Sequence, residues 1–146
     1  MFVEIAGRLD SCRLVFFTYR VPELSDKLRN RLRAVFASHG LDADKFITFI
    51  PWQTPAEFRG LMGRAHVLLD TIGFSGFNTA MEAVECGLPI VTREGRFMRG
   101  RFASGILKRM GLHELVAGTE EDYVDLAVKI CRDAEYRTHL RQRIEA

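Results

Sequence analysis

Residues 65–92, AHVLLDTIGFSGFNTAMEAVECGLPIVT, predict a strand, a helix and a second strand in immediate succession. The apolar run 65–70 is typical of a buried strand, and a loop with glycines and a serine follows it over 71–79. A helix then runs toward Gly87, a residue type that commonly ends helices, and the apolar residues 88–92 form the second strand. A strand–helix–strand unit of this kind favours a parallel sheet with a right-handed crossover.

The same alternation extends to both sides of this unit. All four predicted strands are continuous apolar runs, as a sheet that is covered on both faces requires. We therefore expect an α/β fold, a Rossmann-like parallel sheet with helices on both faces, in a single lobe spanning residues 1–146. The other predicted strands are 13–19 and 45–50, and helices are predicted to begin at Pro22, at Pro55 after a capping box, near Phe102, after the box 119–122 and at Asp133. The helix from Pro22 places Leu24, Leu28, Leu32, Val35 and Phe36 on one face.

Composition describes an ordinary globular protein. The chain has 146 residues, a net charge of +2 and 47% apolar residues, and surface scaling predicts that roughly 69% of its surface is buried on folding. This excludes disordered, collagen-like and disulfide-dense proteins, and the balanced charge argues against a nucleic-acid-binding protein. Three cysteines without a C-x-x-C spacing predict no disulfide and no metal site. No signal peptide or membrane span is apparent, so we expect a cytoplasmic protein without membrane contact.

Ligands of open α/β sheets bind beyond the carboxyl ends of the strands, which directs attention to three loops. The loop 71–79 is the most informative, because glycines allow close backbone approach and the following helix start offers free N–H groups to a phosphate. Asn78 and Thr79 would add side-chain donors. The alternative is an ordinary turn in which Ser75 or Asn78 caps the helix. Neither a P-loop nor a G-x-G-x-x-G motif is present, so ATP hydrolysis and simple NAD binding lack their motifs.

Three further features have both a functional and a structural interpretation. Glu82, one turn into the helix, is placed to accept hydrogen bonds from a ribose, or is simply stabilised by the helix dipole. The segment 93–109 carries six basic residues against one acid, and we interpret most of them as a solvated helix face. Within this segment Arg101 is the candidate for a diphosphate contact. Trp52 and Gln53 follow the second strand, where Gln53 would read a base and Trp52 would stack on it or belong to the core.

The block from Leu69 to Thr92, LDTIGFSGFNTAMEAVECGLPIVT, resembles the C-terminal lobe of the O-linked N-acetylglucosamine transferase family. Members of this family, which include SPINDLY-like bacterial relatives, are TPR-associated, inverting glycosyltransferases of the two-domain B type. Their pattern is roughly L-D-T, N-G-H-T-T-x-x-D/E and G-x-P-x-V-T. The segments 101–104, 111–112 and 121–123 continue the resemblance, which covers about residues 13–145.

The resemblance implies a site for the uridine diphosphate of a nucleotide sugar. Gly76, Thr79 and Glu82 match the family's glycine, second threonine and ribose-binding acid. The family's histidine and first threonine are replaced by Phe77 and Asn78, whose backbone N–H groups remain available for phosphate. Gln53 would contact the uracil base. The lysine and histidine that follow the second strand in well-known members are replaced by Pro55 and Phe58 here.

The function implied is that of the UDP-sugar-binding lobe of a protein O-glycosyltransferase that transfers a sugar similar to N-acetylglucosamine to serine or threonine. The partners would be the UDP-sugar and an acceptor protein, with no metal or other cofactor. The catalytic residues are unknown and are expected in a second, N-terminal lobe, so the isolated chain should be inactive. The alternatives are a lobe of a UDP-sugar 2-epimerase, or a non-catalytic domain that self-associates. Binding of UDP separates the enzymes from the latter.

Overall fold

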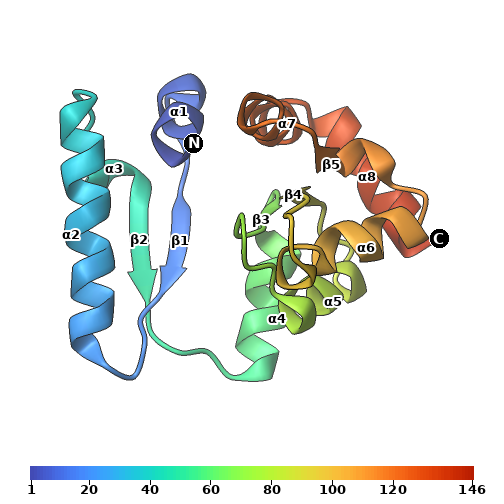
Figure 1. Cartoon of the computed structure of the whole chain (residues 1–146), viewed down its shortest axis with the longest axis horizontal. Coiled ribbons are helices and arrows are strands. Elements are labelled where there is room, and N and C mark those ends of the chain that lie inside the picture. The colour runs from blue at the N-terminus through green and yellow to red at the C-terminus, as the bar shows by residue number, and fades with distance from the viewer. The chain divides into compact units, whose positions relative to one another are not determined.

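The structure is a computed structural model that describes every residue from Met1 to Ala146. It contains parallel strands flanked by helices, which confirms the α/β class. The chain divides into two compact units, Phe2–Thr54 and Pro55–Ala146, and each unit has a parallel sheet of its own (Figure 1).

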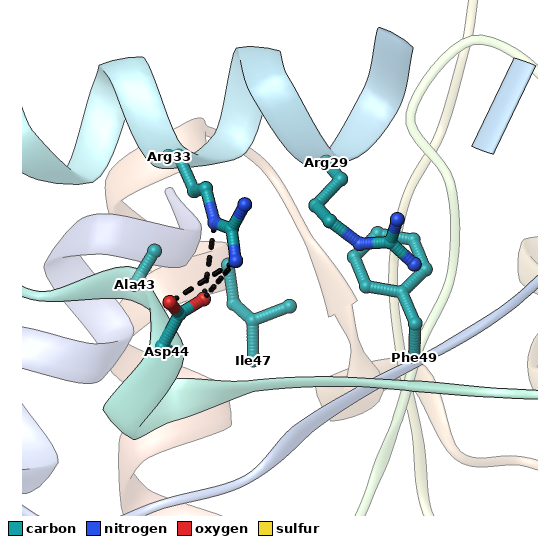
Figure 2. A pocket seen from close by; sticks show the side chains of 6 residues that line it. All are labelled: Arg29, Arg33, Ala43, Asp44, Ile47 and Phe49. Atoms are coloured by element: carbon teal, nitrogen blue, oxygen red, sulfur yellow. Dashed lines mark hydrogen bonds and ion pairs between the residues drawn. The ribbon is translucent and has the colours of Figure 1, made fainter. Parts of the chain in front are cut away.

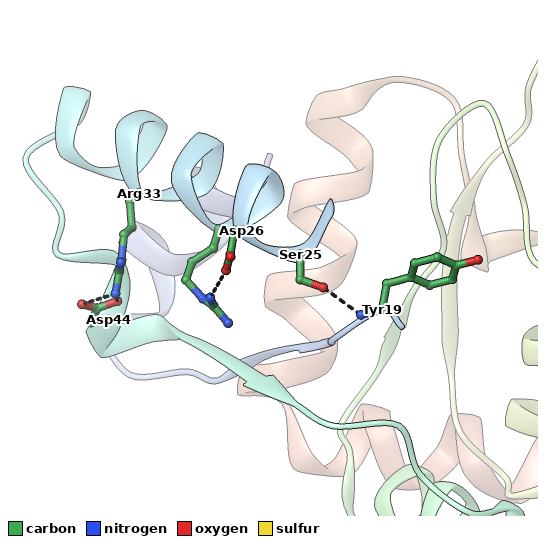
Figure 3. Close-up of polar contacts among 6 residues, drawn as sticks. Tyr19, Ser25, Asp26, Arg33 and Asp44 are labelled. Atoms are coloured by element: carbon green, nitrogen blue, oxygen red, sulfur yellow. Dashed lines mark hydrogen bonds and ion pairs between the residues drawn. The ribbon is translucent and has the colours of Figure 1, made fainter. Parts of the chain in front are cut away.

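The N-terminal unit is a strand–helix–strand unit preceded by a helix. Its two strands are parallel, with Leu14 opposite Ile47 and Phe17 opposite Ile50. Figure 1 shows α2 running alongside both strands. Local polar contacts fix the turns: the Tyr19 N–H donates to Ser25 Oγ at 2.7 Å where α2 begins (Figure 3). The elements are α1 (Phe2–Leu9), β1 (Leu14–Phe17), α2 (Pro22–Ser38), α3 (Ala43–Phe46) and β2 (Ile47–Ile50).

Aromatic side chains form much of the core of this unit. The ring of Phe16 in β1 stacks on that of Phe49 in β2, with centroids 5.4 Å apart, and Phe36 of α2 is fully buried beside Phe46. The rest of the predicted apolar face of α2 is largely exposed, including Leu24, Leu28 and Val35. The helix of 17 residues is about 25 Å long and each strand of four residues about 13 Å, so the two strands cannot cover the full length of α2.

The C-terminal unit is built on the sheet β3-β4-β5, in which all pairings are parallel. The central strand β4 is buried, with Ile90 and Val91 inaccessible to solvent, and helices α5, α6 and α7 contact it. The elements are α4 (Pro55–Arg64), β3 (Leu68–Leu69), α5 (Phe77–Glu85), β4 (Ile90–Arg93), η1 (Met98–Gly100), α6 (Phe102–Arg109), η2 (His113–Leu115), β5 (Val116–Ala117), α7 (Glu120–Arg132) and α8 (Ala134–Glu145).

The predicted helix ends of this unit are confirmed, whereas one strand was not predicted. Thr119 and Asp122 form the expected capping box of α7, and the Asp133 side chain caps α8. Gly87 follows the C-cap of α5 and has φ +63°, the left-handed conformation that often ends a helix and that glycine adopts most readily. The missed strand is β5, which has only two residues and lies in a segment that the sequence predicted as helical. Two residues are too few to produce a recognisable apolar run.

Candidate functional site

The start of α5 lies just beyond β3 and offers three unpaired donors. Gly76 is the N-cap residue, no side chain caps the helix, and the first helical bond runs from the Ala80 N–H to the Gly76 carbonyl. The N–H groups of Phe77, Asn78 and Thr79 have no acceptor in the protein, and the first turn carries no acid. Free N–H groups at the positive end of a helix dipole form an arrangement that binds anions.

The predicted side chains of α5 gather beside these donors. Thr79 is half-buried, and its Oγ1 would lie 3.5 Å from a Cβ added to Gly76, so the hydroxyl lies against the helix start. Glu82 is half-buried and has neither a hydrogen bond nor an ion pair. Asn78, four residues before Glu82 and hence on the same side of the helix, is exposed. Phe77 packs its ring edge against Phe102, the first residue of α6, with centroids 5.7 Å apart, and the only donor that Phe77 offers is its backbone N–H.

The loop before α5 is held by Asp70 and Ser75, whose roles sequence reasoning missed. The Asp70 carboxylate accepts from the Gly76 N–H at 3.3 Å and from Thr92 Oγ1 at 2.7 Å. Ser75, 1% exposed, donates its N–H to the Arg99 carbonyl and accepts the Ala103 N–H on Oγ at 2.9 Å. Ser75 therefore caps α6, and the prediction that Ser75 or Asn78 caps α5 is wrong. An aspartate at the end of a strand, facing a glycine loop, was the available signal.

The basic segment folds onto this loop, and most of its charges are already used. Arg101 donates from Nε to the Gly95 carbonyl at 2.7 Å and lies 3.4 Å from Glu94, while half of its side chain remains exposed. Lys108 also pairs with Glu94, and Arg93 pairs with Glu120. Arg96 and Arg99 both lie over the Phe97 ring. The cluster is thus mainly a set of local contacts. Arg101 is bonded to the loop after β4, and the backbone carbonyl of Arg99 accepts the Ser75 N–H from the loop before α5.

Gln53 and Trp52 belong to the N-terminal unit. The Gln53 side chain is half-buried, and its Nε2 donates to the Pro51 carbonyl at 2.8 Å, so the amide closes its own turn and leaves Oε1 free. Trp52 is 72% exposed, which shows that it is not a core residue. A flat, exposed indole at the carboxyl end of β2 retains the capacity to stack on a ring.

A hollow in the N-terminal unit lies between α2, α3 and β2 (Figure 2). Its two arginines are engaged: Arg33 makes a bidentate pair with Asp44, and the guanidinium of Arg29 lies 4.7 Å from the centroid of the Phe49 ring. Arg29 also pairs with Asp26. Figure 3 shows Asp26 on the same helix as Arg33, whose guanidinium faces Asp44. None of the predicted site residues lines this hollow.

Two further features bear on the kind of site. No group of three or more histidine, cysteine, aspartate or glutamate side chains is arranged to hold a metal ion. None of the helices combines the length and the apolar character that crossing a membrane requires.

Comparison with known proteins gives consistent results. A UDP-N-acetylglucosamine–peptide N-acetylglucosaminyltransferase of Caenorhabditis elegans is 35% identical over 80 residues, 55% of this chain and 7% of that protein. The SPINDLY protein of Solanum lycopersicum, a probable transferase of the same type, is 26% identical over 120 residues, 82% of this chain and 13% of that protein. The chain therefore spans a small part of these relatives.

Solved structures extend the similarity to the fold. A mutant form of the Thermobaculum terrenum O-GlcNAc transferase superimposes with a TM-score of 0.85 and 28% identity, over 99% of this chain and 27% of that one. The fold expected from the sequence, the α/β lobe of a B-type glycosyltransferase, is therefore confirmed. The model of glycosyl transferase family 41 matches residues 1–146, so the chain belongs to glycosyl transferase family 41.

Proposed function

We propose that residues 1–146 form the nucleotide-sugar-binding lobe of a protein O-glycosyltransferase, with a UDP-sugar similar to UDP-N-acetylglucosamine as donor and a serine or threonine of an acceptor protein as the receiving group. The observation that carries this proposal is the set of three unpaired N–H groups at the start of α5, with the unpaired carboxylate of Glu82 one turn further along. Membership of family 41 and the kinship with peptide N-acetylglucosaminyltransferases support the choice of ligand.

In the proposed complex, the diphosphate lies at the start of α5. The N–H groups of Phe77, Asn78 and Thr79 donate to phosphate oxygens, and Thr79 Oγ1 adds a fourth donor. As the bond between the sugar and the diphosphate breaks, negative charge grows on the departing oxygen. Donors and a helix dipole that are already oriented stabilise that charge without reorganisation. This function of the lobe requires no metal ion.

Glu82 and Arg101 complete the proposed ligand set of the C-terminal unit, and Gln53 of the N-terminal unit is proposed separately as the residue that reads the base. A ribose diol would donate to the Glu82 carboxylate, which has no competing partner in the protein. The exposed end of Arg101 would contact a phosphate while its Nε stays bound to the Gly95 carbonyl. Gln53 would meet the uracil edge through its free Oε1 or its backbone.

Calorimetric titration of UDP into the 146-residue chain tests the proposal, with CDP and ADP as controls for base selectivity. Glu82→Gln removes a charge-assisted hydrogen bond and should weaken binding about 10- to 100-fold. Thr79→Val should weaken it by a smaller factor. Glu85→Gln, an exposed acid three residues further along the same helix, is the matched control and should bind like the unmodified chain.

The experiment has clear failing outcomes. Equal binding of UDP, CDP and ADP would refute the assignment of a uridine site, and no heat with any nucleotide at millimolar concentration would refute the lobe as an independent binding unit. We also expect no sugar transfer by this chain alone, because the proposal places the catalytic groups in another lobe. Transfer of radiolabelled sugar to an acceptor by the 146 residues would overturn that part.

A further inference from the structure

Asp70 occupies an unusual position for a charged residue. It follows β3 directly, its N–H extends the sheet by donating to the Val91 carbonyl at 3.0 Å, and the residue is only 9% exposed. No lysine, arginine or histidine pairs with its carboxylate. A buried carboxylate without a cationic partner is costly, and such a group is retained only where other dipoles compensate it.

Two donors compensate the Asp70 carboxylate, and a third donor holds its backbone carbonyl. Thr92 of β4 donates its hydroxyl to Oδ2 at 2.7 Å, and the Gly76 N–H at the start of α5 donates to Oδ1 at 3.3 Å. The Tyr123 hydroxyl of α7 donates to the Asp70 backbone carbonyl at 2.9 Å. Thr92 and Tyr123 are themselves buried, at 0% and 2% exposure. Asp70 is therefore fixed in orientation by the sheet on one side and by α7 on the other.

The bond to Gly76 determines how α5 begins. Gly76 is the N-cap, and its N–H is the donor immediately preceding the three that remain free. By holding this N–H inside the protein, the carboxylate sets the direction of the chain into the helix, and so the direction in which the N–H groups of Phe77, Asn78 and Thr79 point. A displacement of about 1 Å in such donors is enough to lose a large part of their effect on a bound anion.

We propose that Asp70 is a positioning residue for the donor phosphates, acting through the Gly76 N–H, and that Thr92 orients the Asp70 carboxylate for this purpose. The inference rests on the proposed function, because it assigns phosphates to the free N–H groups of α5. It assigns Asp70 no contact with the ligand. Phosphate binding depends on the Asp70 oxygen that accepts the Gly76 N–H and so aligns the start of α5. It does not depend on the negative charge of Asp70.

Two substitutions at position 70 separate alignment from charge. Asp70→Asn keeps an acceptor oxygen for the Gly76 N–H, and its amide can donate to the Thr92 hydroxyl, so UDP affinity should stay within about threefold of the unmodified chain. Asp70→Ala removes the acceptor and should weaken UDP binding at least about tenfold. Thr92→Val keeps the shape of the side chain and removes the hydroxyl, and it should weaken binding about threefold to tenfold. In the Asp70→Ala background Thr92→Val should have no further effect, because its action passes through Asp70.

A second readout does not depend on the nucleotide. In the amide NMR spectrum of the ligand-free chain, Asp70→Ala should shift the Gly76 resonance upfield and accelerate its hydrogen exchange, whereas Asp70→Asn should leave both nearly unchanged. Dispersion of the remaining amide signals establishes that each variant is folded. If Asp70→Ala fails to fold, Thr92→Val and Asp70→Asn carry the test by themselves.

The outcomes distinguish this inference from the proposed function. If the unmodified chain binds UDP and a folded Asp70→Ala variant binds it equally well, the positioning role is refuted and the proposed function stands. If Asp70→Asn loses as much affinity as Asp70→Ala, the charge and not the alignment matters, and the inference is likewise refuted. If the unmodified chain binds no UDP while the Gly76 resonance responds as expected, the proposed function fails, and with it the assignment of phosphates to this helix start.

Discussion

Replacing Ser75 by alanine should destabilise the C-terminal unit by an amount that can be worked out from its contacts. Ser75 is 1% exposed, and its Oγ accepts the N–H of Ala103, the second residue of α6. The N-cap position of α6 itself, Arg101, provides no side-chain cap. The substitution therefore removes the only cap of this helix end and leaves a buried N–H without an acceptor.

The expected magnitude follows from these two losses. Loss of an N-cap costs about 0.5–2 kcal/mol, and an unsatisfied buried donor costs about 1–3 kcal/mol; these describe the same bond, so we expect a total of about 1–3 kcal/mol. Little cavity is created, because only one oxygen atom is removed. The backbone bond from the Ser75 N–H to the Arg99 carbonyl is retained, so the loop should keep its path.

Urea denaturation monitored by circular dichroism measures this effect, and the Cm should fall with an unchanged m-value. Ser38→Ala is a suitable control: Ser38 also makes a hydrogen bond, to the Val35 carbonyl, but it is exposed, so its loss should change stability by less than about 0.5 kcal/mol. A Ser75→Ala variant as stable as the Ser38→Ala variant would refute the view that Ser75 caps α6.

Three further predictions concern the same unit. Gly76→Ala should leave the free energy of unfolding nearly unchanged, because φ of Gly76 is −83° and an added Cβ would meet only the Thr79 side chain, at 3.5 Å. The same variant should bind UDP more weakly in calorimetry. A destabilised variant would contradict the first expectation. Tyr123→Phe removes the hydroxyl from the Asp70 carbonyl and should cost about 1–2 kcal/mol in urea denaturation, and no loss would show that this bond contributes nothing. The hydrogen bond from Lys108 lowers the pKa of Glu94, and the charge of Arg101 lowers it by a smaller amount. The stability that Glu94 contributes is therefore complete above its unfolded pKa and is lost as the pH falls through its folded pKa. The Cm difference between the unmodified chain and Glu94→Gln should shrink between about pH 6 and pH 3, and a constant difference would refute this.

The sequence predicted the fold class well because the spacing of apolar residues and the residues that begin or end helices are local features. The run 65–70, the glycine at 87 and the box at 119–122 each report on a single element, and each is found near its expected place. Strand ends were less predictable: of the predicted strand 65–70 only Leu68–Leu69 pairs regularly. Pairing depends on the neighbouring strand, which local sequence does not specify.

The candidate site was predictable only in part. The start of α5 was identified, because glycine followed by a helix after a strand is a local pattern. The partners that hold it were not, because Ser75 meets Ala103 and Asp70 meets Thr92 across 28 and 22 residues of chain. Arg101 was selected for a phosphate by its charge, yet its Nε binds the Gly95 carbonyl, a contact that only the folded loop creates. The roles of Gln53, Thr79 and Glu82 remain predictions.

The contact between the loop that follows β3 and the loop that follows β4 bears on how this lobe can be re-engineered. A Cβ at Gly100 would lie 3.2 Å from the Gly95 Cα and 3.4 Å from the Gly73 carbonyl, and the Gly95 N–H donates to the Gly100 carbonyl at 2.8 Å. Three stretches of backbone thus touch without intervening side chains, which leaves no room for an inserted residue or a bulkier one. A chimera that takes residues 71–79 from a relative must also take residues 94–103, because the backbones of the two loops are in direct contact and have to fit each other.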